Sequence, residues 1–296
     1  MGGFSTVNNI KTTDVITVAY MLVTALFMFV FGGFSEMFLA PVMIRLTVIL
    51  FVVAVIYFHI KWDYNWINFI HLFYPVLLLT YFYGETALIN NLIFLENLDP
   101  IIYNWEEALF GFQPSLEFSI RFPQNWFSEL LYMGYFSYYL LTFGVSLMFF
   151  IFKPVMAEKV IFIVITSLFI HYLVFIVFPV VGPQYYFSVP FSEVVDSGFF
   201  SRAVKLVQYY GEHPTAAFPS SHVALVVIFL YISYYNIRWL FWLIVPLFIL
   251  ILLATVYIKA HYAVDVFAGL LSAPIVYYLS VILYRFIRKK LYKIKH

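Results

Sequence analysis

Long apolar runs separated by short polar breaks dominate the hydrophobic pattern of this chain. We expect eight of these runs to cross a lipid bilayer, because each approaches the roughly 20 residues that a transmembrane helix needs. The pattern therefore predicts an all-α fold, a polytopic transmembrane helix bundle of about eight spans. The spans cover about Val15–Phe34, Val42–Ile60, Trp66–Gly84, Phe127–Phe152, Val160–Val181, Pro219–Tyr235, Trp239–Ile258 and Tyr262–Tyr284.

Two longer polar stretches interrupt the apolar pattern. The first, from Glu85 to Trp126, is too polar to span a membrane and too aromatic to be a plain linker, so we expect an interfacial or re-entrant layer. The second runs from Gly182 to Phe218. Glu129 stands at the start of the fourth span, where it is either a charge at a helix N-terminus or a contact to a lipid headgroup.

The composition supports the membrane interpretation and excludes several classes. Of 296 residues, 64% are hydrophobic and 10% are charged, whereas a soluble domain has roughly 45–50% apolar and about 25% charged residues. The net charge of +1 excludes a broadly basic nucleic-acid-binding protein. Cysteine is absent, so the chain has no disulfide framework, thiol nucleophile or thiolate metal site.

The basic residues orient the predicted bundle. The tail after Tyr284 is rich in lysine and arginine, so the positive-inside rule places the C-terminus in the cytoplasm. An even number of spans then places the N-terminus there too, and both long polar stretches on the outer side. Arg45 falls on the outer side as an exception to the rule. We expect an integral, multi-pass protein of a bacterial inner or plasma membrane, with its functional groups facing outside.

Two polar clusters stand at the starts of two predicted spans on that outer side. The first is Phe218–His222, with sequence Phe-Pro-Ser-Ser-His, and the second is Lys259–Asp265. His261 and Asp265 are four residues apart, which places them on one face of a helix. Proline suits a first helical turn, and the free N–H groups there form an anion site. Two histidines, a carboxylate and an anion-binding helix start together indicate phosphoryl transfer through a histidine.

These clusters resemble the second and third signatures of the type 2 phosphatidic acid phosphatase (PAP2) superfamily. The segment Val180–Tyr186 is similar to the degenerate first signature of a branch that includes inositol phosphorylceramide synthases. The chain departs from the standard signatures, because no lysine or arginine stands near Gly182 and Thr255 replaces a usual arginine. The branch resemblance also takes in Tyr74-Pro75, the stretch from Asp99 to Pro114, and Ser128-Glu129-Leu130.

The resemblance implies a domain organisation and a reaction. Residues 66–284 would form a PAP2-type catalytic membrane domain with a six-helix core, preceded by transmembrane helices in 1–65 and followed by a basic cytoplasmic tail in 285–296. The function would be that of a lipid phosphatase or phosphotransferase acting at the outer leaflet. Its partners would be a lipid phosphate and the bilayer, with no nucleic acid and no indicated oligomeric state. The alternative is a transferase that moves a phospho-headgroup from a phospholipid to a lipid alcohol.

The resemblance also assigns roles to single residues. His261 would be the nucleophile that forms a phospho-histidine, Asp265 would orient its ring, and His222 would protonate the leaving oxygen and then activate water or alcohol. No metal or cofactor would be needed. With the usual cations missing, the phosphate charge would have to be met by Lys259 or by Arg202 and Lys205 in the second polar stretch. The substrate-binding residues would be Ser220, Ser221 and Lys259, with Gln184 and Tyr185 at the position of the first signature.

Other interpretations of the same residues remain open at this point. A zinc hydrolase would use His222, His261 and Asp265 as ligands, although the neighbouring serines and Lys259 favour an anion. A transporter would hold its ionisable groups near the bilayer midplane, whereas these groups stand at span ends. A Ser-Ser-His sequence is also an ordinary helix cap, and His261 with Asp265 is also an ordinary structural pair. Of the remaining histidines, we expect His59 and His71 to be interfacial, His171 to be a hydrogen-bonded packing residue and His213 to lie on a flexible surface.

Overall fold

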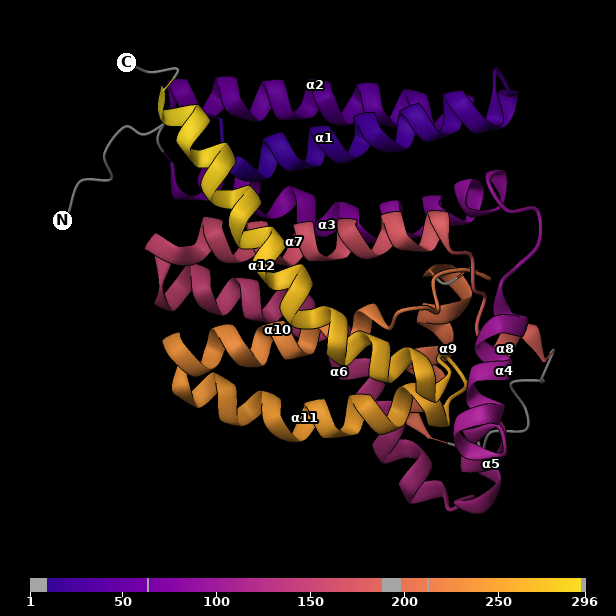
Figure 1. The fold of residues 1–296 in the computed structure, drawn as a ribbon. Coiled ribbons are helices and arrows are strands. Elements are labelled where there is room, and N and C mark those ends of the chain that lie inside the picture. Colours follow the sequence, from indigo (N-terminus) through magenta and orange to yellow (C-terminus); the bar gives the residue numbers. More distant parts are fainter. Residues whose placement is uncertain (1–9, 63, 188–197, 212, 294–296) are drawn as a thin grey trace.

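The computed structural model describes residues 10–62, 64–187, 198–211 and 213–293, and these residues form helices without any strand (Figure 1). Eight apolar helices run side by side or obliquely through the bundle. Each coincides with one of the predicted spans, so the all-α bundle is confirmed. They are α1 (Thr12–Phe27), α2 (Leu39–Lys61), α3 (Asn65–Ile89), α6 (Asn125–Phe152), α7 (Pro154–Val177), α10 (Ser221–Asn236), α11 (Arg238–Tyr257) and α12 (Ala263–Lys293).

Seven of the eight helices in the described part are long and apolar enough to cross a membrane; α1 does so together with the π-turn η1 (Met28–Gly32), and a 3-10 turn, η2 (Glu36–Phe38), precedes α2. The exception is α10, whose 16 residues span about 24 Å. A hydrocarbon core is about 30 Å thick. Helix α10 is therefore too short to cross the hydrocarbon core by itself, and its start carries the Phe218–His222 cluster.

Successive long helices alternate in direction, so the start of α1 and the last turns of α12 lie at the same end of the bundle (Figure 1). We call this the far end. At the opposite end, which we call the layered end, short helices cover the bundle. They are η3 (Asn90–Leu92), α4 (Asp99–Phe110), α5 (Pro114–Arg121), α8 (Pro183–Tyr186) and α9 (Phe199–Gly211). The first polar stretch therefore forms the expected layer at one end, and the described part of the second lies at the same end.

The structure corrects three boundaries, one of them the end of the last span, because α12 continues past Tyr284 to Lys293. Glu85 was expected to open the first polar stretch, but α3 continues past it to Ile89. The reason is a buried ion pair: Glu85 accepts hydrogen bonds from the Arg45 guanidinium on α2 at 2.6 and 2.7 Å. The charge of Arg45 is thus neutralised inside the bundle, which explains its exception to the positive-inside rule. The fifth span was expected at Val160–Val181, yet α7 starts at Pro154, where proline suits a first helical turn.

Helix α7 is the centre of the bundle and contacts α1, α3, α6, α10 and α12. It is apolar on all sides, as is typical of a fully enclosed helix. Helix α12 approaches the start of α10 closely because residue 269 is glycine: a Cβ atom there would lie 2.6 Å from the carbonyl oxygen of Ser220. This close approach brings the two polar clusters together at the layered end.

Candidate active site

The first cluster is built around the N-terminus of α10. Ser220 is the N-cap residue, and its Oγ accepts the N–H of Val223 at 3.4 Å. The Ser220 N–H donates to the backbone oxygen of Asp265 at 3.0 Å, which ties this helix start to α12. His222 therefore lies in the first turn of α10, where backbone N–H groups lack intrahelical acceptors. Ser220 is wholly buried and acts as a cap, so Ser221 is the serine that remains beside His222.

The second cluster is the link between α11 and α12. Lys259 adopts a left-handed conformation with φ of 66°, which ends α11 and turns the chain. The His261 N–H then donates to the carbonyl oxygen of Thr255 at 2.9 Å. Asp265 Oδ2 accepts the N–H of Tyr262 at 2.8 Å and so caps the start of α12. These local contacts fix the side chains of His261 and Asp265 relative to the helix ends.

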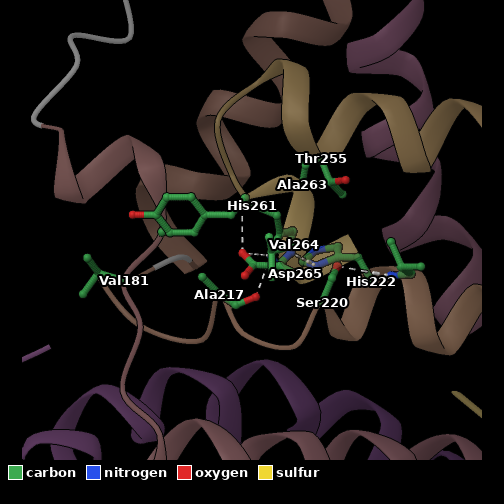
Figure 2. Close-up of polar contacts among 12 residues, drawn as sticks. Val181, Ala217, Ser220, His222, Thr255, His261, Ala263, Val264 and Asp265 are labelled. Atoms are coloured by element: carbon green, nitrogen blue, oxygen red, sulfur yellow. Dashed lines mark hydrogen bonds and ion pairs between the residues drawn. The ribbon is translucent and has the colours of Figure 1, made fainter. Parts of the chain in front are cut away.

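The two signature histidines meet across the clusters (Figure 2). His261 Nε2 lies 3.1 Å from His222 Nδ1, and His261 Nδ1 lies 2.7 Å from the carbonyl oxygen of Ala217. A carbonyl oxygen can only accept, so Nδ1 of His261 carries the proton. Nε2 of the neutral ring then accepts from His222. The His261 tautomer is thereby set, and its Nε2 lone pair is directed at His222.

Asp265 stands beside this pair, but it is not the main acceptor of the His261 ring N–H that we expected it to bind. Its Oδ2 is 3.5 Å from His261 Nδ1, so Ala217 rather than Asp265 is the nearer acceptor of that proton. The other oxygen, Oδ1, has no hydrogen-bond partner among the described residues, and the side chain is wholly buried. Asp265 thus places a buried carboxyl group next to the imidazole, while the backbone orients the ring.

Aromatic rings and a cavity border His222. The ring of Tyr138 on α6 lies 4.1 Å from the His222 ring between centroids, and that of Tyr135 lies 5.1 Å away. Ser221 and His222 also line a cavity of about 280 Å³. Its other walls come from α3, α6, α7 and α9 and include Leu79, Phe143 and Leu168. A largely apolar space inside the bundle thus reaches Ser221 and His222.

The segment around Gly182 completes the site. Gly182 has φ of +90°, and a Cβ atom there would lie 3.0 Å from the Ala260 oxygen and 3.2 Å from the Ala217 Cβ. The Gln184 N–H donates to the carbonyl oxygen of Lys259 at 3.0 Å. Gln184 and Tyr185, both half-buried in α8, thus lie beside the α11–α12 link, and the Lys259 side chain is buried there too. All three segments with signature resemblance converge at the layered end.

Not every predicted contributor lies in this cluster. Thr255, at the position of the usual arginine, donates its hydroxyl to the Leu252 carbonyl at 3.1 Å and supplies no charge. Arg202 and Lys205 belong to α9, and Arg202 is exposed. Glu129 is the N-terminal charge of a helix, but of α9 rather than its own: it accepts the N–H groups of Phe200 and Ser201, each at 2.9 Å. Only tertiary folding reveals this pairing.

Two buried carboxylates on α4 were missed by the sequence reasoning. Asp99 accepts the N–H groups of Val181 and Gly182 at 2.9 and 3.0 Å, and Glu106 accepts that of Ala263. Burial raises the pKa of both carboxyls, that of Glu106 to about 7. The sequence held only a weak signal for this role of Asp99. Asp99-Pro100 is typical of a helix start, but the local pattern does not indicate which N–H groups the carboxylate binds.

The fold and the site define a class: a multi-pass membrane protein in which two histidines and an aspartate meet beside a helix N-terminus at one end of the bundle. A family model described as the PAP2 superfamily matches residues 101–279, which include all three segments. The chain belongs to the PAP2 superfamily, and this membership supports a phosphatase-type function. The comparisons with curated proteins and with solved structures gave no match. The likeness to the inositol phosphorylceramide synthase branch stays an expectation.

Proposed function

We propose that the protein hydrolyses a lipid phosphate through a covalent phosphoryl intermediate on His261. The observation that carries this proposal is the position of the His261 ring. Its Nδ1–H is held by Ala217 beside Asp265, and its Nε2 lone pair faces His222 at 3.1 Å. A nucleophile with a fixed tautomer, a neighbouring carboxylate and an acid–base group in reach is the arrangement that nucleophilic catalysis requires.

In the first step, His261 Nε2 attacks phosphorus and the bond to the lipid oxygen breaks. His222 donates its proton to that oxygen, which leaves as a lipid alcohol. The positive charge that develops on the His261 ring is stabilised by Asp265. Because the two rings are in hydrogen-bond contact in this structure, the arriving phosphoryl group replaces that hydrogen bond and the rings separate.

In the second step, neutral His222 takes a proton from water, whose oxygen attacks phosphorus as the P–N bond breaks. Inorganic phosphate leaves and both histidines return to their starting state. The non-bridging oxygens are held by Ser221, by the N–H groups of the first turn of α10 and by Lys259, which act on charge as it develops.

The lipid nature of the substrate is supported by the cavity beside His222. Its volume of about 280 Å³ lies among α3, α6, α7 and α9, with Val76, Leu77 and Phe143 in its lining. Apolar walls offer no hydrogen bonds to a water-soluble phosphate, whereas they accommodate the hydrocarbon chain of a lipid, which is as apolar as the membrane interior that it leaves. We propose that the phosphate lies at Ser221 and His222 and that the chain extends into this cavity.

A direct assay tests the hydrolytic proposal. The purified protein in detergent, given phosphatidic acid, should release inorganic phosphate, and a chelator should not reduce the rate. The matched variants are His261→Ala for the site and His213→Ala for an exposed histidine outside it. Loss of activity on chelation would favour the zinc hydrolase, and release that persists in His261→Ala would refute the role of His261.

A second function, transfer to an alcohol, is favoured by the charges at the site. Three wholly buried carboxylates, Asp99, Glu106 and Asp265, lie with a single buried lysine, Lys259, among the described residues there. A site with one buried cation binds a phosphomonoester dianion less well than a phosphodiester, which has one charge fewer. Given phosphatidylinositol and ceramide, a transferase would form a phosphorylceramide without releasing phosphate from phosphatidic acid. That outcome would replace the phosphatase proposal.

We also propose that the layered end faces outside, because the basic residues near the end of α12 lie at the far end (Figure 1). The cysteine-free chain allows a clean test. Glu96, exposed just before α4, marks the layered end, and Lys153, exposed between α6 and α7, marks the far end. An impermeant thiol reagent on intact cells should label Glu96→Cys and not Lys153→Cys. The reverse labelling would invert the orientation.

A further inference from the structure

Helix α4 presents one buried stripe to the site and an exposed face to the other side. Asp99, Ile102 and Glu106 are wholly buried, whereas Asn104 and Glu107 are exposed. The buried positions follow the i, i+3, i+7 spacing of one helix face. Burying two carboxylates is unfavourable unless they are hydrogen-bonded, so their partners indicate what they do.

Asp99 joins the first-signature segment to the segment that carries His261. One oxygen accepts the Val181 N–H at 2.9 Å, and the other accepts the Gly182 N–H at 3.0 Å and the Tyr262 hydroxyl at 3.1 Å. Tyr262 is the residue after His261. A single side chain thus fixes the backbone on one side of the site and the flank of the His261 loop on the other.

Glu106 acts on the other flank of the same loop. Its Oε1 accepts the N–H groups of Ala263 and Val264, the two residues before Asp265, and so caps α12 from outside that helix. Its Oε2 has no hydrogen-bond partner among the described residues. Helix α4 therefore holds the three inner residues of the segment from His261 to Asp265, through two carboxyl groups that are seven positions apart.

We propose that Asp99 and Glu106 are positioning residues for the reaction at His261, holding the His261–Asp265 segment against the α10 start from opposite flanks. This inference rests on the proposed function. Standard signatures place basic residues around the phosphate, and those are absent here at Gly182 and Thr255. The two carboxylates fix the same loops through backbone N–H groups, before any ligand binds. Pre-organisation of this kind lowers the barrier because a misplacement of about 1 Å costs roughly 10²-fold in rate.

Substitutions at Glu106 and Asp99 can separate their role as hydrogen-bond acceptors from an effect of their negative charge. Glu106 serves through one accepting oxygen, so Glu106→Gln keeps the cap and Glu106→Ala removes it. Asp99 uses both oxygens as acceptors, so Asp99→Asn loses one of them, since an amide nitrogen cannot accept. Exposed neighbours provide the matched controls, Glu107→Gln for Glu106 and Glu96→Gln for Asp99.

The experiment measures kcat and KM of these variants with phosphatidic acid, together with thermal unfolding of each. We expect Glu106→Ala to lower kcat roughly 10²-fold with little change in KM, Glu106→Gln to recover most of it, and Asp99→Asn to fall between them. The controls should match the parent protein. A folded Glu106→Ala or Asp99→Asn variant with parental kcat would overturn the proposal, as would Glu106→Gln being as slow as Glu106→Ala.

A readout without substrate separates this proposal from the proposed function. In protein labelled with ¹⁵N-histidine, the His261 ring signals, assigned with His261→Gln, should show Nδ1–H in the parent and in Glu106→Gln. They should show exchange between tautomers in Glu106→Ala and a smaller change in Asp99→Asn. If the parent protein transfers no phosphoryl group but these shifts occur, the proposed reaction is wrong and the positioning role stands. Unchanged His261 signals in Glu106→Ala and in Asp99→Asn would overturn the positioning role.

Discussion

Two clusters of the same residue types stand at opposite ends of this bundle. At the layered end, His261 and His222 are in contact at 3.1 Å beside Asp265. At the far end, the Nδ1 atoms of His59 and His71 are 3.0 Å apart, and His71 Nε2 donates to Asp14 at 2.9 Å. Composition alone does not distinguish the two sets. Their surroundings do.

The far-end cluster is closed by its own hydrogen bonds. Asp14 accepts the Tyr74 hydroxyl at 3.0 Å and the Lys11 N–H at 2.7 Å in addition to His71, so both of its oxygens are engaged. None of these side chains lines the cavity that reaches His222. At the layered end, Asp265 keeps an oxygen without a hydrogen-bond partner among the described residues, and a helix start and a cavity adjoin the histidines. The far-end set ties α1, α2 and α3 together, whereas the layered-end set leaves room for a substrate.

The largest expected effect separates the two clusters by activity. His261→Ala should abolish phosphate release, a loss on the order of 10⁶-fold for a missing nucleophile. His71→Phe at the far end should keep the kcat of the parent protein per folded molecule. The assay is phosphate release from phosphatidic acid, normalised to folded protein. A large loss of kcat in folded His71→Phe would break the comparison.

The next effect lies within the layered end. His222→Ala removes the group that we propose protonates the leaving oxygen, and such an acid contributes roughly 10²–10⁴-fold to the rate. We expect kcat to fall by that factor with little change in KM, because the serine and lysine contacts to phosphate remain. A substrate with a more acidic leaving group, such as a nitrophenyl phosphate ester, should recover part of the rate. Equal losses for both substrates would contradict the acid role.

A moderate effect on stability is expected at the far end. His71→Phe removes one of the three hydrogen bonds that buried Asp14 accepts, and a hydrogen bond to a carboxylate contributes about 1.5–3 kcal/mol. The free energy of unfolding in detergent should fall by that amount, and Asp14→Asn combined with His71→Phe should recover part of it. His213→Phe, at an exposed position, is the control. A neutral His71→Phe would show that the far-end cluster does not stabilise the bundle.

The smallest expected effect is a pH dependence peculiar to the layered end. Burial raises the pKa of Glu106 from 4.5 to about 7, so between these values the folded protein binds a proton that the unfolded chain does not. Stability then falls as pH rises through this window, because the folded state binds more protons. In Glu106→Gln this contribution is absent. The melting temperature measured from pH 4.5 to 7.5 should therefore decline less steeply in the variant, and identical slopes would contradict the assignment.

The sequence predicted those features that local patterns encode. Apolar runs predicted the eight helices, and the Phe218–His222 and His261–Asp265 spacings predicted that the two histidines and Asp265 lie at one end of the bundle. His171 was expected to be a hydrogen-bonded packing residue, and its Nδ1 indeed donates to the Ser167 oxygen at 2.7 Å. His71, in contrast, was expected to be interfacial and is wholly buried. Its partner Asp14 is 57 residues away, so no spacing rule reveals the pair.

The remaining errors share this cause. Glu106 caps α12 across 157 positions of sequence, and Arg45 neutralises Glu85 across 40. The Ala217 carbonyl that sets the His261 tautomer is a backbone atom, which no residue type identifies. Each of these contacts depends on how helices pack rather than on periodicity or capping, so each became visible only with the fold.

Mapping the covalent intermediate tests the central claim most directly. The purified protein is mixed with phosphatidic acid labelled in its phosphate, quenched in base, digested and sequenced by mass spectrometry. We predict a base-stable, acid-labile phosphoryl group on His261, no label on His59 or His71, and no label at all in His261→Ala. A phosphoryl group on a far-end histidine, or a label that persists in His261→Ala, would contradict the assignment of the active site to the layered end.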